Sequence, residues 1–192
     1  MPDVADLVGR LVPGAQQLSV PFVVLLLAHV PAGMTSVAAG AMAAVSKKRP
    51  GRHPRFGTIY FWALAVVFVS ASGMATLMWI EDRHLFVLGA ISFGVASVGY
   101  TARKLRWDGW KSFHGLGMGV SYVVLLTAFY VDNGPHLPLW DRLPAIAYWI
   151  LPTLVGLPLL VLGLRRNTRF SSDLRAAART LSRSARGHVN TA

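Results

Sequence analysis

Long apolar runs without a charged side chain recur along this chain, and short polar segments separate them. A bilayer core about 30 Å thick needs roughly 20 helical residues, with a working range of about 17–25. Five runs meet that length, so the pattern predicts an all-α fold, an integral membrane bundle of five transmembrane helices. The predicted helices cover about 18–45, 57–80, 84–102, 112–131 and 143–164, and we expect the third to be the shortest.

Composition favours a single membrane domain between two polar segments. The chain is 54% hydrophobic and 14% charged, whereas soluble domains carry roughly 25% charged residues. We expect residues 1–17 to form a short extracytoplasmic segment, 18–164 the membrane domain, and 165–192 a basic, disordered cytoplasmic tail. The first segment carries acids where a signal peptide would be basic, which predicts no cleavage. The absence of cysteine excludes disulfides, thiolate metal sites and a catalytic thiol.

The uneven distribution of basic residues predicts the orientation. Segment 46–56 holds five Lys or Arg residues, segment 103–111 holds four, and the tail from Arg165 onward holds seven. Five crossings put these three regions on one side, opposite Arg10, Arg83 and Arg142. Because basic loops stay in the cytoplasm, the N-terminus is predicted outside and the C-terminus inside. The net charge of +11 then indicates anionic lipid headgroups as partners of the loops and tail, and no nucleic acid.

Small residues recur at helical spacing in three of the predicted helices. They are Gly33, Ser36 and Gly40 in the first, Gly89, Ser92, Ala96 and Gly99 in the third, and Gly115 and Gly119 in the fourth. Such positions let helix backbones approach closely in lipid. The pattern predicts tight packing of these three helices, within the molecule rather than in a dimer.

His29 lies about 15 Å below the outer end of the first predicted helix, at about 1.5 Å per residue. An ionisable side chain near mid-bilayer faces the bundle interior and marks a functional position by default. Two interpretations stay open. His29 is either a neutral side chain hydrogen-bonded to a neighbouring helix through Ser or Tyr, or a ligand or proton relay.

Two further histidines, His53 and His114, are predicted at the cytoplasmic mouth of the bundle. Axial haem ligands must sit at one depth, which disfavours His29 with His114 and favours His53 with His114. Met118 follows His114 by one helical turn and is a candidate soft ligand. A metal ion, haem or quinone headgroup is one interpretation of this group, and ordinary interfacial anchoring is the other.

The outer segment 129–144 contains turn chemistry at Asp132-Asn133-Gly134-Pro135. His84, Asp132 and His136 are candidate ligands for a divalent metal ion there. The alternative is a structured cap that closes the bundle. The chain has no hydrolase triad, Walker motif, zinc-protease motif or dinucleotide fingerprint, so nothing in it demands catalysis.

Three pieces in this order resemble the bacterial membrane-protein family called domain of unknown function 2306. The first is His29 followed by glycines on the first helix. The second is "HPRFGTIY", with His53, Gly57 and Tyr60 in the family's positions, and the third is "HGLGMGVSY", with His114, Met118, Ser121 and Tyr122. The resemblance covers about residues 25–130 and implies a multi-pass membrane protein without supplying a reaction. The candidate cofactor-binding residues are therefore His29, His53, His114, Met118 and Tyr122.

Three functions follow from these patterns for a multi-pass protein of the bacterial plasma membrane. The leading hypothesis is a non-enzymatic membrane subunit or partner. The alternative is a haem-, metal- or quinone-linked redox protein that uses the inner histidines, with haem b or a metal ion as cofactor. The third is a small proton-coupled transporter with His29 as its buried relay.

Overall fold

The computed structural model describes residues 19–138 and 140–165, apart from the side chains of Glu81 and Asp82. The elements are α2 (Val20–Val45), α3 (Arg52–Leu77), α4 (Trp79–Leu105), α5 (Trp110–Asn133), the 3₁₀ turn η2 (Gly134–His136) and a fifth long helix (Ala145–Arg165). The described part is all-helical, and five of its helices are long and apolar enough to cross a membrane. The predicted fold class, a five-helix integral membrane bundle, is confirmed.

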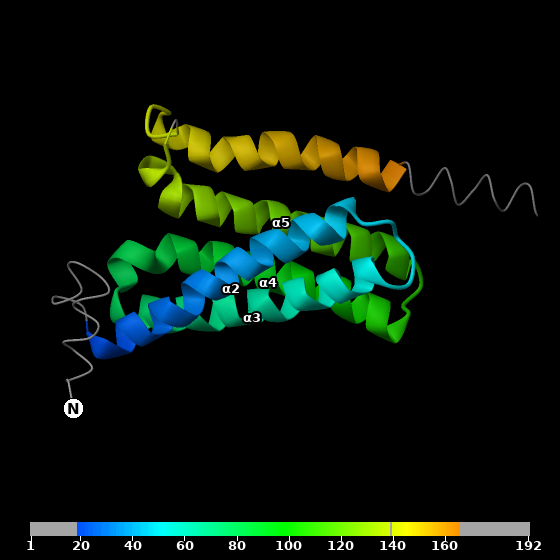
Figure 1. The fold of residues 1–192 in the computed structure, drawn as a ribbon, viewed down its shortest axis with the longest axis horizontal. Coiled ribbons are helices and arrows are strands. Elements are labelled where there is room, and N and C mark those ends of the chain that lie inside the picture. The colour runs from blue at the N-terminus through cyan, green and yellow to red at the C-terminus, as the bar shows by residue number, and fades with distance from the viewer. Residues whose placement is uncertain (1–18, 139, 166–192) are drawn as a thin grey trace, which may run out of the picture.

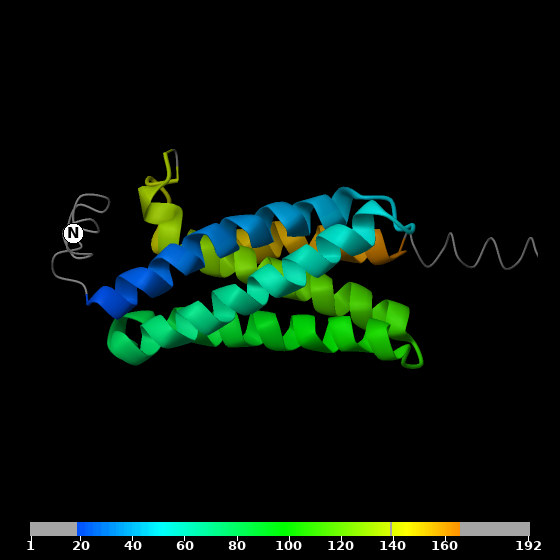
Figure 2. The ribbon, with the colours of Figure 1, turned by 60° about the horizontal axis from the view of Figure 1, so that its bottom comes forward.

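Consecutive long helices run antiparallel, so the bundle has two distinct ends (Figures 1 and 2). One end carries the 46–51 turn, the 106–109 turn and Arg165, and we call it the basic end. The opposite end carries Val20, the α3–α4 junction and the segment after α5. The structure therefore gathers the two basic loops at one end. The predictions for residues 1–17 and for the tail after Arg165 lie outside the described residues.

Two helices begin earlier than the charge pattern predicts. α3 begins at Arg52 rather than 57, because Pro54 suits the first turn of a helix, where its missing N–H is not needed. His53 is thus on the first turn of α3 and not in a loop. α4 begins at Trp79 and spans 27 residues, so the expectation that the third helix is the shortest is wrong. Charged residues can extend a helix beyond the apolar core, which the run lengths alone do not reveal.

An aromatic ladder joins α3 to α4. Phe61 stacks on Tyr100 with ring centroids 4.1 Å apart and planes within 7°, and Phe68 stacks on Phe93 at 5.2 Å. Phe86 continues the ladder against Phe68. The positions on each helix are seven apart, which places them on one face. The ladder extends the core in which Tyr60, Phe61 and Leu64 are buried.

Glycine brings α4 and α5 into backbone contact. A Cβ atom added to Gly117 would lie 2.8 Å from the Cα of Gly99 and 2.9 Å from the carbonyl oxygen of Val95. Further along the same interface, Ser92 of α4 donates a hydrogen bond of 2.9 Å to the carbonyl of Ser121 on α5. The small residues of the third and fourth helices therefore form a close interface, as predicted.

The first long helix behaves differently from the prediction. α2 packs mainly along α3, not along α4. It reaches α5 where Gly40 makes room for the ring of Tyr122, which a Cβ atom at position 40 would overlap. Small residues allow a close approach, but their spacing does not say which helix approaches.

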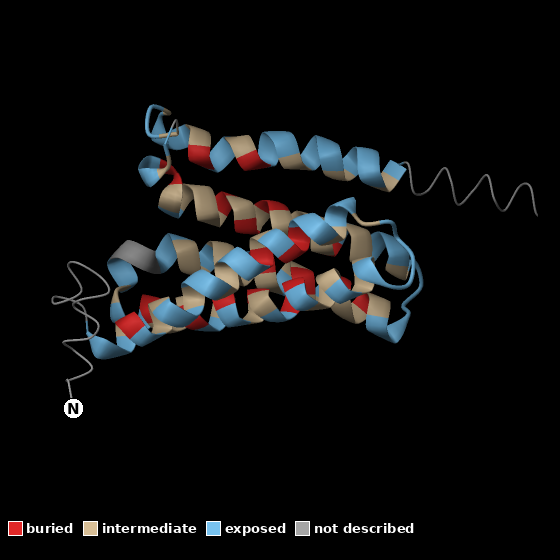
Figure 3. Ribbon diagram, viewed as in Figure 1, coloured by how far each residue is buried: buried red, intermediate tan, exposed pale blue. Residues whose placement is uncertain are grey.

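The fifth helix packs against α5 and is otherwise exposed (Figure 3). Gly115 and Gly119 of α5 accommodate Leu164 and Leu160, and Gly156 accommodates Val123 in return. The GxxxG pair thus packs within the molecule, as predicted, although against the fifth helix.

Candidate histidine site

The structure brings His53 and His114 together at the basic end, as their matched depths predict. Their ring centroids are 6.3 Å apart, and the ring planes are nearly perpendicular at 87°. His53 is on the first turn of α3 and His114 on the second turn of α5. Both side chains are half-buried. The two rings therefore form a defined pair supplied by two different helices.

A backbone carbonyl fixes each ring. Nδ1 of His53 lies 2.9 Å from the carbonyl oxygen of Ala43, in the last turn of α2. Nδ1 of His114 lies 3.1 Å from the carbonyl oxygen of Gly99 on α4. A carbonyl only accepts, so each Nδ1 is the donor and carries the hydrogen. In a neutral imidazole this leaves Nε2 with the lone pair, the arrangement typical of histidine ligands.

The Nε2 atoms of the pair are not used in hydrogen bonds between described residues. No fully buried nitrogen or oxygen of a described side chain lacks a partner, so neither Nε2 atom is completely buried. His53 and His114 thus offer two oriented lone pairs to a ligand.

Positive charge surrounds the pair. Lys48 and Arg103 are close enough to act electrostatically on His114. Asp108 is the one acidic residue at the basic end within residues 19–138 and 140–165. The surroundings therefore favour an anionic ligand over a bare cation.

His29 is part of a different contact. Its Nδ1 lies 2.9 Å from Oγ of Ser70 on α3, and that hydroxyl donates to the carbonyl of Val66 at 2.7 Å. Ser70 thus accepts from His29, which is the interhelical hydrogen bond of the first interpretation. Ser70 and His53 are roughly 25 Å apart along α3 at about 1.5 Å per residue, so His29 stands far from the pair.

The other residues of the three motifs hold helices together. Tyr60 donates to Ser121 at 2.8 Å, because the Ser121 hydroxyl itself donates to the carbonyl of Met118. Tyr122 donates to the carbonyl of Val37 on α2 at 3.0 Å, and Met118 packs against the core. Met118 and Tyr122 therefore take part in helix packing, and their predicted role as ligands stays a prediction.

The candidate metal ligands at the end opposite the basic end, His84, Asp132 and His136, do not form a metal site in the described structure. No group of three or more His, Asp or Glu side chains that could hold a metal ion occurs among residues 19–138 and 140–165. His84 lies beside Trp149 with ring centroids 6.3 Å apart, while Asp132 and His136 are exposed. The described part of the outer segment has the features of the predicted cap.

Two residues important for this architecture, Tyr148 and Ser70, are not marked by the sequence pattern. Tyr148 donates to the carbonyl of Trp140 at 2.7 Å and packs on Gly134, which ties the outer segment to the fifth helix. Ser70 holds His29. Serine is common in membrane helices, so the sequence alone does not single out Ser70. Only its contact with His29 across the helix interface does so. A buried tyrosine at an interface does carry a signal, because its hydroxyl needs a partner.

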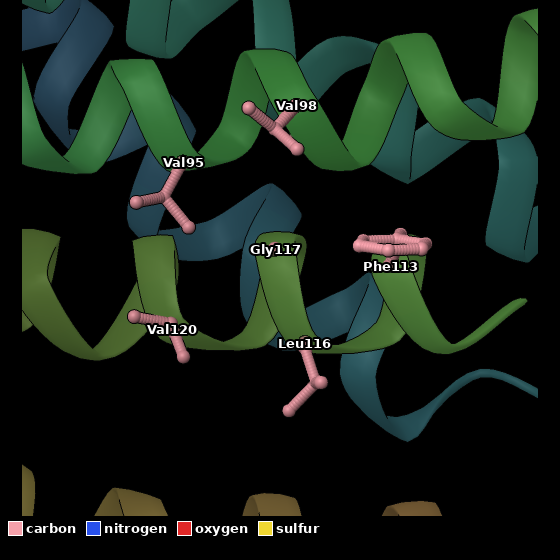
Figure 4. Close-up of a pocket in the computed structure, with 6 residues that line it drawn as sticks. All are labelled: Val95, Val98, Phe113, Leu116, Gly117 and Val120. Atoms are coloured by element: carbon pink, nitrogen blue, oxygen red, sulfur yellow. The ribbon is translucent and has the colours of Figure 1, made fainter. Parts of the chain in front are cut away.

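A cavity of about 230 Å³ lies between α4 and α5 (Figure 4). Val95 and Val98 line it from α4, and Phe113, Leu116, Gly117 and Val120 line it from α5. None of these side chains offers a hydrogen-bonding group, so the cavity has no side chain that could bind a polar ligand or act as a catalytic group.

The architecture and the histidine pair define a five-helix membrane bundle with one candidate ligand site. No protein-family model, curated protein or solved structure matches the chain.

Proposed function

We propose that this chain is a multi-pass protein of the bacterial plasma membrane that holds a haem-type cofactor between His53 and His114. One observation carries the proposal: imidazoles from α3 and α5 stand 6.3 Å apart, each fixed through Nδ1 by a carbonyl. Haem iron with two axial histidines is a common electron carrier in membranes. The proposed role is therefore electron transfer.

The spacing of the rings supports a shared metal. An imidazole nitrogen binds a transition metal at about 2.0–2.1 Å, so two rings on opposite sides of one ion have centres roughly 6 Å apart. The observed 6.3 Å agrees with that value. The helices that carry the two histidines also pack into one bundle, which would hold this spacing.

The number of ligands and the local charge favour haem over a hydrated metal ion. The described residues supply two histidines here and no cluster of three metal ligands. Haem brings four porphyrin nitrogens of its own and leaves two axial positions. Its propionate carboxylates also suit the positive charge of Lys48 and Arg103, whereas a bare cation does not.

The orientation is part of the proposal. The basic loops share one end of the bundle, and the excess of Lys and Arg there supports a cytoplasmic location for it. The cofactor would then lie near the inner surface, with the N-terminus outside. The resemblance to domain of unknown function 2306 includes His53 and His114, which supports a shared role for them.

A non-enzymatic membrane subunit is the second candidate. In the most apolar stretch of each helix, only 17% of the residues of α2 and 11% of those of the fifth helix are buried inside the protein. Lipid alone can cover such faces, but they also offer room for a partner helix. Transport through His29 stays a third prediction, since its contact with Ser70 does not identify a substrate path.

The test is the absorption spectrum of the full chain, expressed with ample haem precursor and iron and purified in detergent. We expect a Soret band that sharpens and shifts when dithionite reduces the sample, with about one haem per chain. His53→Ala and His114→Ala should each lower the bound haem by about tenfold or more, because each removes an iron ligand.

The matched control is His84→Ala, which removes an exposed histidine at the opposite end. This variant should retain the wild-type spectrum and haem content. A colourless wild-type protein without metal would overturn the haem proposal. A polypeptide that co-purifies with that colourless protein would support the subunit candidate instead.

A further inference from the structure

A second feature of the basic end is an open groove of about 490 Å³. It lies where α2 ends, the chain turns, and α3 begins. Met42, Val45, Ser46, Lys47, Arg49, Pro50 and Arg52 line it. Its volume falls within the range of about 300–1,000 Å³ found for small-molecule sites.

The groove has an apolar part and a cationic part. Met42 and Val45 belong to the last turns of the α2 span, and their side chains are 42% and 80% exposed. Lys47, Arg49 and Arg52 follow just beyond that span and are exposed as well. Along the bundle axis, the apolar surface therefore comes first and the positive charge lies at the membrane boundary.

No carboxylate on these two helices neutralises this charge. α2, the 46–51 turn and α3 contain no Asp or Glu. The positive end of the α3 dipole also lies here, since the helix begins at Arg52 after Gly51, which has no capping side chain. The charges lie beyond the end of the hydrophobic span, at the depth of lipid headgroups.

From this placement we propose that the groove binds one anionic glycerophospholipid of the adjacent leaflet. The phosphate would lie among Lys47, Arg49 and Arg52, and an acyl chain would follow Met42 and Val45 along α2. Guanidinium groups bind phosphate oxygens in pairs of hydrogen bonds, which suits Arg49 and Arg52. This proposal does not depend on the haem proposal, because none of the groove residues is a histidine of the pair.

The experiment compares lipid retention by the full-length protein in detergent. Wild-type protein is incubated with phosphatidylglycerol or with phosphatidylcholine of the same acyl chains, and bound lipid is counted by native mass spectrometry. We expect about one tightly retained phosphatidylglycerol per chain and little phosphatidylcholine. The triple variant Lys47→Gln, Arg49→Gln, Arg52→Gln should retain about tenfold less, since each basic residue near the surface adds to the attraction.

A second triple variant is the matched control. Lys104→Gln, Arg106→Gln, Lys111→Gln removes the same charge from the other basic loop at the same end. It should retain the lipid like the wild type. Equal loss in both variants would overturn the proposal, because it would show attraction to the whole basic end.

Two further measurements separate the alternatives. Inorganic phosphate at the same concentration should not displace the lipid, and displacement would show a simple phosphate site instead. The thermal midpoint without added lipid should be the same in both triple variants, since all six side chains are exposed. Loss of retention by a groove variant with an unchanged midpoint supports the proposal, and full retention overturns it.

Discussion

At the residue scale, one buried serine, Ser121, connects three helices. Tyr60 on α3 donates to Ser121 on α5, and the carbonyl of Ser121 accepts from Ser92 on α4. All three side chains are at most 2% exposed. Because the bilayer core contains no water that could replace these hydrogen bonds, such bonds fix the register of neighbouring helices.

Removing the Tyr60 hydroxyl group should lower the stability of the bundle measurably. Tyr60→Phe leaves the ring in the core and loses one interhelical bond, with an expected cost of about 0.5–1.5 kcal/mol. The free energy of unfolding in mixed detergent micelles measures it. Tyr130→Phe is the control, because the Tyr130 hydroxyl makes no hydrogen bond to a described residue. Equal stability of Tyr60→Phe and the wild type would contradict this assignment.

Individual residues were predictable where chemistry and depth both limited the choices. The proximity of His53 and His114 follows from their matched depths, and an interhelical hydrogen bond for His29 follows from the cost of a bare imidazole in lipid. The partners themselves were not predictable. Ala43 and Gly99 accept through backbone carbonyls, which every residue has.

At the element scale, backbone contact between α4 and α5 depends on the absence of two side chains. Gly99 and Gly117 face each other, and neither position tolerates a Cβ atom without movement of backbone. Gly94, also on α4, is exposed and would have no atom within 4 Å of an added Cβ. A glycine-to-alanine substitution should thus have opposite effects at a position that faces the other helix and at an exposed position.

Gly117→Ala should destabilise the bundle by about 1–3 kcal/mol, because α4 and α5 must separate to admit a methyl group. Gly94→Ala should be neutral or stabilising by up to about 1 kcal/mol, since alanine is the better helix former. Unfolding in mixed micelles compares the two variants. A Gly117→Ala protein as stable as Gly94→Ala would refute the close contact.

The existence of the five helices was predictable, their exact ends were not, and their neighbours were only partly so. Run length and the bilayer thickness sufficed for five helices. The seven-residue spacing of Phe61 and Phe68 on α3, and of Phe86, Phe93 and Tyr100 on α4, is visible in the sequence, but it does not identify the helix that each set faces. The spacing of small residues does not identify the neighbouring helix either. It did not reveal that α2 lies along α3 rather than along α4.

At the scale of the whole molecule, the two ends differ in charge, and the proposed orientation is directly testable. The chain has no cysteine, so a single introduced cysteine is the only labelling site. Lys111 at the basic end and His136 at the opposite end are both exposed. A membrane-impermeant maleimide applied to intact cells reports which end is outside.

We expect His136→Cys to be labelled in intact cells and Lys111→Cys only after permeabilisation, because the positive-inside rule keeps the basic end in the cytoplasm. The unmodified chain is the control and should stay unlabelled. The reverse pattern would place the basic end outside and exclude the proposed orientation.

The α3–α4 junction has a consequence for how the protein enters the membrane. Met78 alone separates the two helices. Only a short polar stretch, residues 81–84 in the first turns of α4, has to be exported between the two spans, so α3 and α4 would be released into the bilayer together as a helical hairpin. A truncated chain that ends near Leu77 would lack the second helix of this hairpin. The smallest fragment expected to integrate stably therefore contains both helices.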